Sequence, residues 1–338
     1  MKKNKMIIAV VAVVAAALII TAVVCDSFFS QKEYEDTGFA MGAVIAQKIK
    51  AENPEEVAKE IINKIRITEN RISWRIEKSE IAKLNKNKNA EISDETKKYL
   101  SDTIDVCKKS NGAVDLTVGN LTNAWNIGSE NFRIPQKNEL EAIIENVDWQ
   151  KVKTENNFVT IGDNQSIDLG FVGKGIACDE AKAILQKHQA KQGVISVGGS
   201  LCLFGNGTFD IGIRNPHGNV NDYMAVLSLE ECFVSTSGNY ERFSEKGGKK
   251  YHHILSTYTG YPVENNLLSV TVVCSSGLLS DALSTACYCL GFEKSLELLE
   301  EYNAEAVFIF DDNTVKVTEN LKEKIEIKNN EFELWKEN

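Results

Sequence analysis

The feature that most constrains this chain is its mixture of helical and strand periodicities over one long body. From about Phe39 onward, no Pro/Ser-rich linker, long charge run or internal repeat divides the sequence. Helical periodicity begins at Asn53–Pro54, where asparagine is expected to cap and proline suits the first turn, and it recurs from Ser93 to near Gly112. Strand patterns occupy 158–161, 209–213 and 268–274, and a hairpin is expected from 306–310 and 314–317. Because the two types do not alternate regularly, we predict one α+β domain with mixed or antiparallel sheets and packed helices, not a doubly wound fold.

The N-terminus differs from this body. Lysines near the start precede an uncharged apolar run, Met6 to Val24, and charge returns at Asp26. A run of about 19 apolar residues is long enough to cross a bilayer, and lysines before it stay on the cytoplasmic side. The alternative, a buried core helix, fits poorly because the run has no polar face. We expect a signal or anchor segment at 1–25, a short tether at 26–38, the main domain at 39–320 and a polar tail at 321–338.

The kind of anchor is left open by the residues around Cys25. Ala22-Val23-Val24-Cys25 resembles a lipoprotein cleavage site, at which Cys25 would be lipidated. Val24 departs from the small residue usual before the cysteine, so an uncleaved signal anchor is the alternative. Either form would hold the domain at the extracytoplasmic face of the cell membrane.

Charge and cysteine usage exclude other classes. The net charge of -10 argues against a nucleic-acid partner, since phosphate backbones need a basic surface. The seven cysteines after Cys25 are an odd number in apolar contexts, which is not typical of a disulfide framework. We expect most of them to be buried small hydrophobes.

Two glycine-rich stretches lie between apolar segments. Ser166 to Gly175 leaves a strand, passes three glycines and enters a helix near Ile176. Its backbone amides would suit a phosphate at the helix N-terminus, although an ordinary strand–helix turn has the same composition. Ser196 to Ser200 holds a glycine pair, which by itself indicates a bulge or hairpin turn.

Two further stretches carry hydroxyls, histidines and a carboxylate. Ser235 to Tyr240 is followed by His252 and His253, of which one is a candidate base or phosphate contact. If a helix begins at Ser280, then Asp281, Ser284 and Thr285 share one face and offer hard oxygen ligands for Mg²⁺. The alternative is that Ser280 caps the helix and Asp281 only complements its dipole.

The order and spacing of these stretches resemble the ApbE family of FAD:protein FMN transferases, from about Met41 to Val317. The matching motifs are Met41-Gly42, Trp74 with Ser79-Glu80-Ile81 and Leu84-Asn85, Gly112 to Asp115, Asp168 to Gly175, Val197 to Gly199, Arg214 to Pro216, Thr236 to Gly238, His253-Ile254 with Thr259-Gly260, and Asp281 to Thr285. The resemblance implies a T-fold-related ApbE-like domain.

The resemblance also implies a reaction. The family cuts FAD at its diphosphate, releases AMP and attaches FMN to a Thr or Ser hydroxyl of a partner protein. By the same resemblance, Mg²⁺ would lie among Asp281, Ser284, Thr285 and the backbone carbonyl of Phe171. The FAD site would be lined by Met41, Trp74, Ala113, Val114, Asp115, Asp168, Lys174 and Ile254. His253 is our candidate for the base, and the acceptor would be an extracytoplasmic subunit of a membrane redox complex.

The chain departs from the family pattern at several positions. Trp74 replaces a common Tyr, Val114 replaces Phe, and Ser200 stands where Asp or Asn is frequent. The largest departure is 255–258, Leu-Ser-Thr-Tyr, where the family usually has Ile-Asp-Pro, and we expect a looser turn there. Two alternatives stay open: an FAD diphosphatase that gives FMN and AMP, and a flavin-binding lipoprotein without activity.

Overall fold

The computed structural model describes residues 32–219 and 221–335. The predicted anchor at 1–25, with Cys25, falls outside these residues. Within the described ranges, no helix has the length and apolar character needed to cross a membrane.

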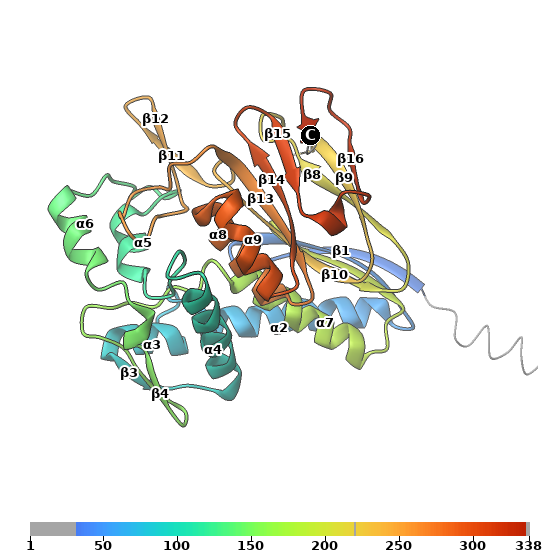
Figure 1. Cartoon of the computed structure of the whole chain (residues 1–338). Coiled ribbons are helices and arrows are strands. Elements are labelled where there is room, and N and C mark those ends of the chain that lie inside the picture. Colours follow the sequence, from blue (N-terminus) through green and yellow to red (C-terminus); the bar gives the residue numbers. More distant parts are fainter. Residues whose placement is uncertain (1–31, 220, 336–338) are drawn as a thin grey trace, which may run out of the picture.

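A large sheet forms the centre of the molecule (Figure 1). Its nine strands, in spatial order, are β1 (Lys32–Ala40), β2 (Ala43–Ala51), β6 (Gln192–Val197), β7 (Ser200–Gly205), β10 (Cys232–Gly238), β13 (Leu267–Cys274), β14 (Glu305–Phe310), β15 (Thr314–Val317) and β17 (Glu333–Leu334). Neighbouring strands are antiparallel except for the parallel pair β15 and β17.

Helices cover one face of this sheet and a small second sheet covers the other. The three long helices against the sheet are α2 (Pro54–Ile72), α7 (Gly173–Lys187) and α8 (Gly277–Leu290). The apolar stripe of α2 packs on Ile45 and Ile49 of β2, as its periodicity predicts. The second sheet contains β8 (Phe209–Arg214), β9 (Tyr223–Leu229) and β16 (Ile325–Ile327), whose apolar side chains meet Val307 and Ile309 of β14.

The remaining elements include α4 (Asp94–Lys109), which packs on α8, and a set of shorter segments (Figure 1). They are α3 (Glu80–Asn87), β3 (Asn89–Glu91), α4, α5 (Gly119–Trp125), α6 (Lys137–Ile144), η1 (Trp149–Lys151), β4 (Lys153–Glu155), β5 (Phe158–Thr160), β11 (Phe243–Lys246), β12 (Lys249–His252), α9 (Phe292–Glu301) and η2 (Glu319–Leu321).

The strands and the hairpin expected from apolar patterns are confirmed as β5, β8, β13, β14 and β15. Two capping predictions are wrong. The side chain of Asn53 makes no capping hydrogen bond to α2. Helix α8 begins at Gly277, four residues after Val273 of β13, and its cap is Ser276, so Ser280 lies inside the helix. Ser280 instead donates to the carbonyl oxygen of Gly277 at 2.9 Å.

Both boundaries of the main domain also move. The expected tether overlaps β1, which pairs with β2 along its whole length from Lys32. The expected polar tail holds β16 and β17, and its Leu321 and Phe332 are buried in the core beside the second sheet. Only a few apolar side chains anchor this segment to the core. Its average composition is polar, so the sequence pattern wrongly indicated a peripheral tail.

Candidate active site

Two tight turns and the end of the central strand β10 lie together at one end of the strands of the large sheet. The turn between β1 and β2 has Met41 and Gly42 at φ of 54° and 67°. The turn between β6 and β7 lies beside it, because the amide of Gly198 donates to the carbonyl oxygen of Val44 at 3.2 Å. Ser200 at the start of β7 faces Ser235 of β10 in register. The glycine pair is therefore a hairpin turn, and it brings β2, β7 and β10 to a common end.

Helices α7 and α8 cross with their backbones almost in contact, and the crossing fixes Asp281. A Cβ atom on Gly175 would lie 2.0 Å from the carbonyl oxygen of Gly277. At this crossing the amide of Gly175 donates to Oδ2 of Asp281 at 2.9 Å. The hydroxyl of Ser200 donates to Oδ1 at 3.2 Å, and Nζ of Lys174 lies 3.9 Å from the same oxygen. Helix α7 and strand β7 thus hold a carboxylate that is only 2% exposed.

The charges around Asp281 are coupled. Burial raises the pKa of the Asp281 carboxyl, and Lys174 opposes that shift. Burial lowers the pKa of Lys174, but the carboxylates of Asp281 and Glu241 outweigh it, so its pKa is raised. Lys174 is therefore a stable cation at neutral pH, held between two carboxylates.

These groups line a cavity of about 550 Å³, the main cavity. Of the residues predicted for the site, those that line it are Met41, Ala113, Val114, Asp115, Asp168, Phe171, Lys174, His253, Ile254, Asp281 and Thr285. Trp74 and Ser284 are the two that the cavity wall does not include. The structure thus brings together segments spread from residue 41 to residue 285.

Ser284 is buried behind the wall of the main cavity, and Ser237 of β10 lines the cavity in its place. The hydroxyl of Ser284 is fully buried and donates to the carbonyl oxygen of Asp281 at 2.9 Å. Ser237 of β10, which lines the cavity, is hydrogen bonded to Ser284 at 2.8 Å and to Thr285 at 3.0 Å. Of this cluster of three hydroxyl residues, Ser237 and Thr285 line the cavity and Ser284 does not.

Trp74 likewise supports a neighbour that lines the cavity. The guanidinium carbon of Arg75 lies 4.2 Å from the centroid of the Trp74 ring, and Arg75 lines the main cavity. Arg242 lines it from another segment, where burial lowers its pKa, with the charge of Arg75 acting in the same direction. Neither guanidinium forms an ion pair with a carboxylate of the described residues. Two such cations near each other would both be stabilised by an anion.

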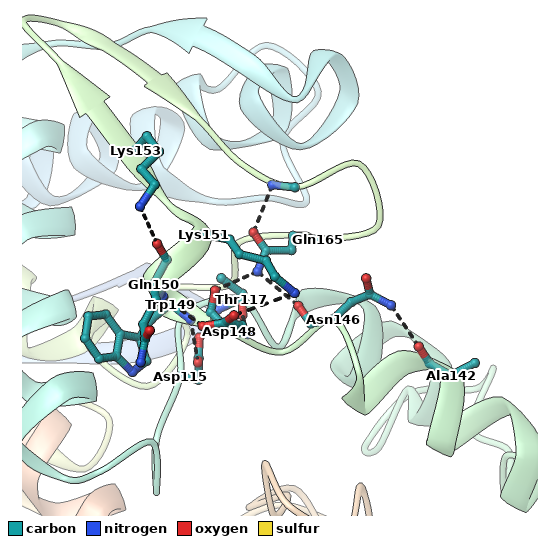
Figure 2. A network of polar contacts seen from close by, with 11 residues as sticks. Asp115, Thr117, Ala142, Asn146, Asp148, Trp149, Gln150, Lys151, Lys153 and Gln165 are labelled. Atoms are coloured by element: carbon teal, nitrogen blue, oxygen red, sulfur yellow. Dashed lines mark hydrogen bonds and ion pairs between the residues drawn. The ribbon is translucent and has the colours of Figure 1, made fainter.

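Asp115 organises the loop on the far side of the cavity. Its Oδ1 accepts from the amide and hydroxyl of Thr117, both at 2.8 Å, and its Oδ2 accepts from the amide of Trp149 at 2.9 Å. Figure 2 shows this network continuing to Gln165, which donates to the carbonyl oxygens of Asn146 and Asp148. Both carboxylate oxygens of Asp115 are thus occupied by the loop. Asp168 makes one such bond within its own loop, where Oδ1 accepts from the amide of Gly170 at 2.8 Å.

His253 lines the main cavity, and one of its ring nitrogens contacts the backbone. Its Nδ1 lies 3.1 Å from the carbonyl oxygen of Arg242. Because a carbonyl only accepts, Nδ1 carries the proton and Nε2 keeps a lone pair. His253 lines the main cavity and keeps an exposed surface, and desolvation by the groups packed around its ring lowers its pKa to about 4. The imidazole is neutral at physiological pH, as a base must be.

Comparison with known proteins agrees with this geometry. The model of the ApbE family matches residues 41–308. The chain belongs to the ApbE family. A protein of Treponema pallidum named FAD:protein FMN transferase is 30% identical over 249 residues, 67% of this chain and 68% of the relative. An Escherichia coli K12 protein of the same name is 33% identical over 210 residues, and the match spans 58% of that relative.

Solved ApbE structures share the fold. The crystal structure of the ApbE protein from Thermotoga maritima superposes with a TM-score of 0.81 at 28% identity, over 87% of this chain and 99% of that one. The flavin transferase ApbE from Vibrio cholerae gives a TM-score of 0.77 at 22% identity. The expected mixed α and β ApbE fold is confirmed.

The turn that departs from the ApbE pattern is firmly held in this chain. The hydroxyl of Ser256 accepts from the amides of Tyr258 and Thr259, both at 3.2 Å. The hydroxyl of Thr257 donates to the carbonyl oxygen of Gly112 at 2.6 Å, and the hydroxyl of Tyr258 donates to the carbonyl oxygen of Asn111 at 2.7 Å. The looser turn expected from the lost Asp and Pro is therefore not found, because hydroxyl groups fasten it to the segment before Ala113.

Sequence reasoning missed several groups of this ApbE cavity. They are Arg75, Trp125, Ser237, Glu241 and Arg242. Ser237 belongs to the stretch Ser235 to Tyr240, and Glu241 and Arg242 follow that stretch directly. Their closeness to it in sequence was the signal that could have predicted their place in the site. Trp125 is fully buried and donates through Nε1 to the carbonyl oxygen of Gly260 at 2.7 Å, which joins α5 to the turn at 256–260.

A metal ion at this site would depend on one carboxylate. Within the described residues, no group of three or more His, Cys, Asp and Glu side chains is arranged to hold a metal. Asp281 and the hydroxyl of Thr285 are nevertheless suitable for Mg²⁺, which commonly keeps several waters and takes one or two carboxylates together with substrate phosphates. The donor set therefore fits Mg²⁺ as a partner of a bound diphosphate, not as a fully caged ion.

Proposed function

We propose that this chain transfers FMN from FAD to a Thr or Ser hydroxyl of an acceptor protein and releases AMP. The observation that carries the proposal is the buried Asp281 carboxylate beside Lys174 and Thr285, at the wall of a cavity that also holds Arg75 and Arg242. One acidic ligand for a divalent cation and three side-chain cations suit a diphosphate. The names of the relatives support the same chemistry.

The residues have distinct roles in this proposal. Asp281, Thr285 and the carbonyl of Phe171 would hold Mg²⁺, which when bound neutralises charge on the diphosphate. Arg75, Lys174 and Arg242 bind the phosphates. The acceptor oxygen forms a bond to the flavin-side phosphorus while the bond from that phosphorus to the bridging oxygen breaks, and AMP leaves with the electron pair. The proton of the acceptor hydroxyl goes to Nε2 of His253.

The proposal includes location and partner. The apolar run ending at Cys25 motivates a lipid or signal anchor that places the domain at the extracytoplasmic face of the membrane. An acceptor that is a subunit of a membrane redox complex would then lie within reach.

A labelling assay tests the function. The purified full chain is incubated with FAD, Mg²⁺ and a soluble FMN-acceptor domain of an extracytoplasmic redox subunit. The expected result is a flavin-fluorescent acceptor band on a denaturing gel, with AMP released in step. AMP release that is as fast without acceptor identifies an FAD diphosphatase instead. Tight FAD binding without turnover at any Mg²⁺ concentration identifies a flavin-binding protein without activity.

The pH dependence of the reaction tests His253. Because the pKa of His253 is lowered to about 4, the base is neutral above that pH and is lost by protonation below it. We expect kcat/KM for the acceptor to stay level as the pH falls through about 6.5, the ordinary histidine value, and to fall only towards about 4. His253→Gln should lower kcat by about 10² or more and abolish this acid limb. An acid limb near the ordinary histidine value that His253→Gln removes would contradict the assignment, whereas a limb that survives in the variant belongs to another group, such as Asp281.

A further inference from the structure

A second cavity adjoins the main one. This side cavity has a volume of about 520 Å³ and is bounded by β12 and the loop 256–264. Ala113 and Cys289 line both cavities, so the two share part of a wall. Nothing in the proposed roles of the main cavity uses the side cavity.

The partition between the cavities is thin and fixed. His252 lines the side cavity and the next residue, His253, lines the main cavity. Nε2 of His252 lies 2.9 Å from the carbonyl oxygen of Val263, and its ring meets Tyr288 edge-on with centroids 5.8 Å apart. His253 is held by Arg242 on the opposite strand of the hairpin. The two adjacent histidines thus line different cavities, and the side cavity borders the segment that carries the candidate base.

The lining of the side cavity suits a polypeptide. Three tyrosines contribute to it, and two of them are exposed: Tyr258 at 61% and Tyr261 at 39%. Exposed tyrosines with an apolar ring and a polar hydroxyl are typical of surfaces that bind protein segments. The hairpin of β11 and β12 projects from the body of the molecule (Figure 1), and β12 contributes to this lining.

The rim of the side cavity is basic on an acidic chain. Lys249 and Lys250 line it together with a single carboxylate, Glu264. Lys249 pairs with Glu264 at 3.1 Å, whereas Lys250 has its Nζ 4.7 Å from the centroid of the Phe243 ring. Lys250 is exposed and lies opposite Glu245 in the β11–β12 hairpin, with no ion pair between the two, so its ammonium group can contact an acidic partner.

We infer that the side cavity is the docking groove for the acceptor, and that it takes an acidic segment carrying the hydroxyl to be modified. This inference rests on the proposed function, since only a protein acceptor gives the groove a role. The segment lies along β12 with its acidic side chains at Lys250, and its hydroxyl enters the main cavity beside Ala113 and Cys289, which line both cavities.

The test compares Lys250→Glu with wild type. We expect KM for the acceptor domain to rise by about tenfold, because a favourable charge contact becomes a repulsive one. The dissociation constant for FAD and the AMP release seen without acceptor should not change. The difference in KM should shrink at high ionic strength. Lys294→Glu, at an exposed position of α9 outside both cavities, changes the net charge equally and should behave as wild type.

A binding measurement separates this inference from the proposed function. Fluorescence anisotropy follows a short peptide with one central Thr flanked by Asp and Glu, without FAD or Mg²⁺. Wild type should bind it more tightly than Lys250→Glu and should reject the version with Lys flanks. No binding by wild type, equal binding by both chains, or an equal rise of KM in Lys294→Glu overturns the docking groove. If the peptide binds wild type more tightly than Lys250→Glu but no acceptor domain is labelled, the docking groove is supported and the proposed FMN transfer is refuted.

Discussion

Asp281→Asn is expected to lower FMN transfer by about a thousandfold while the fold survives. Asparagine has nearly the shape of aspartate but no charge, so it would not hold a divalent cation against the diphosphate, and that loss corresponds to several kcal/mol. Stability should fall by about 1–3 kcal/mol, because Lys174 loses one of its two neighbouring carboxylates but keeps Glu241, and the asparagine amide can still hydrogen bond to Gly175 and Ser200. The measurements are acceptor labelling, AMP release over a range of Mg²⁺ concentrations, and thermal unfolding.

Asp179→Asn is the matched control, since Asp179 joins the same two helices without lining the main cavity. Its carboxylate accepts from the amides of Gly277 and Leu278, both at 2.8 Å, and so satisfies the start of α8. Its replacement should lower the free energy of unfolding by about 1–3 kcal/mol. The Mg²⁺ dependence of AMP release by the protein that remains folded should not change. If Asp281→Asn labels acceptor as well as wild type, or if both variants lose activity only in proportion to unfolded protein, the metal assignment is wrong.

The sequence predicted the parts of the fold that are strongly apolar. Strands β13 and β14 are buried on both faces, and their runs of Val, Ile and Phe were recognised. Strand β1 was not, because it lies at the edge of the sheet and carries charges that pair across the surface. Lys48 of β2 contacts Glu33 at 3.1 Å and Glu35 at 2.9 Å. Charged residues on an edge strand protect it from pairing with other chains, and they also resemble a linker.

The candidate site was predictable where it lies on one helix and not where it depends on tertiary contacts. Helical spacing alone places Asp281 and Thr285 on one face of α8. It also places Ser284 there, and only the packing of β10 against α8 decides that Ser284 is buried while Ser237 reaches the cavity. The loops around Asp115 and Asp168 were assigned to the site only through the family resemblance. Their hydrogen bonds join segments that are distant in sequence, and no local pattern predicts that these segments lie together.

Gly175→Ala is expected to destabilise the chain by at least about 3 kcal/mol and to abolish transfer with it. The new Cβ atom would lie 2.0 Å from the carbonyl oxygen of Gly277 and 2.8 Å from Cβ of Asp281. Both obstacles belong to a buried helix, so the conflict is relieved only if α7 and α8 separate, which is a severe form of overpacking. Separation also removes the hydrogen bond from the Gly175 amide to Asp281. Denaturant unfolding and acceptor labelling measure the two effects.

Gly173→Ala and Gly277→Ala make this prediction specific to the crossing. Gly173 also begins α7, but a Cβ there meets no atom within 4 Å, so alanine should leave stability unchanged or raise it by up to about 1 kcal/mol. A Cβ on Gly277 would lie 2.2 Å from the carbonyl oxygen of Gly175, so its replacement should be as damaging as that of Gly175. Equal stability of all three variants would mean that the helices can part without cost. The contact would then have no part in positioning Asp281, whose carboxylate would have to be fixed by Ser200 and Lys174 alone.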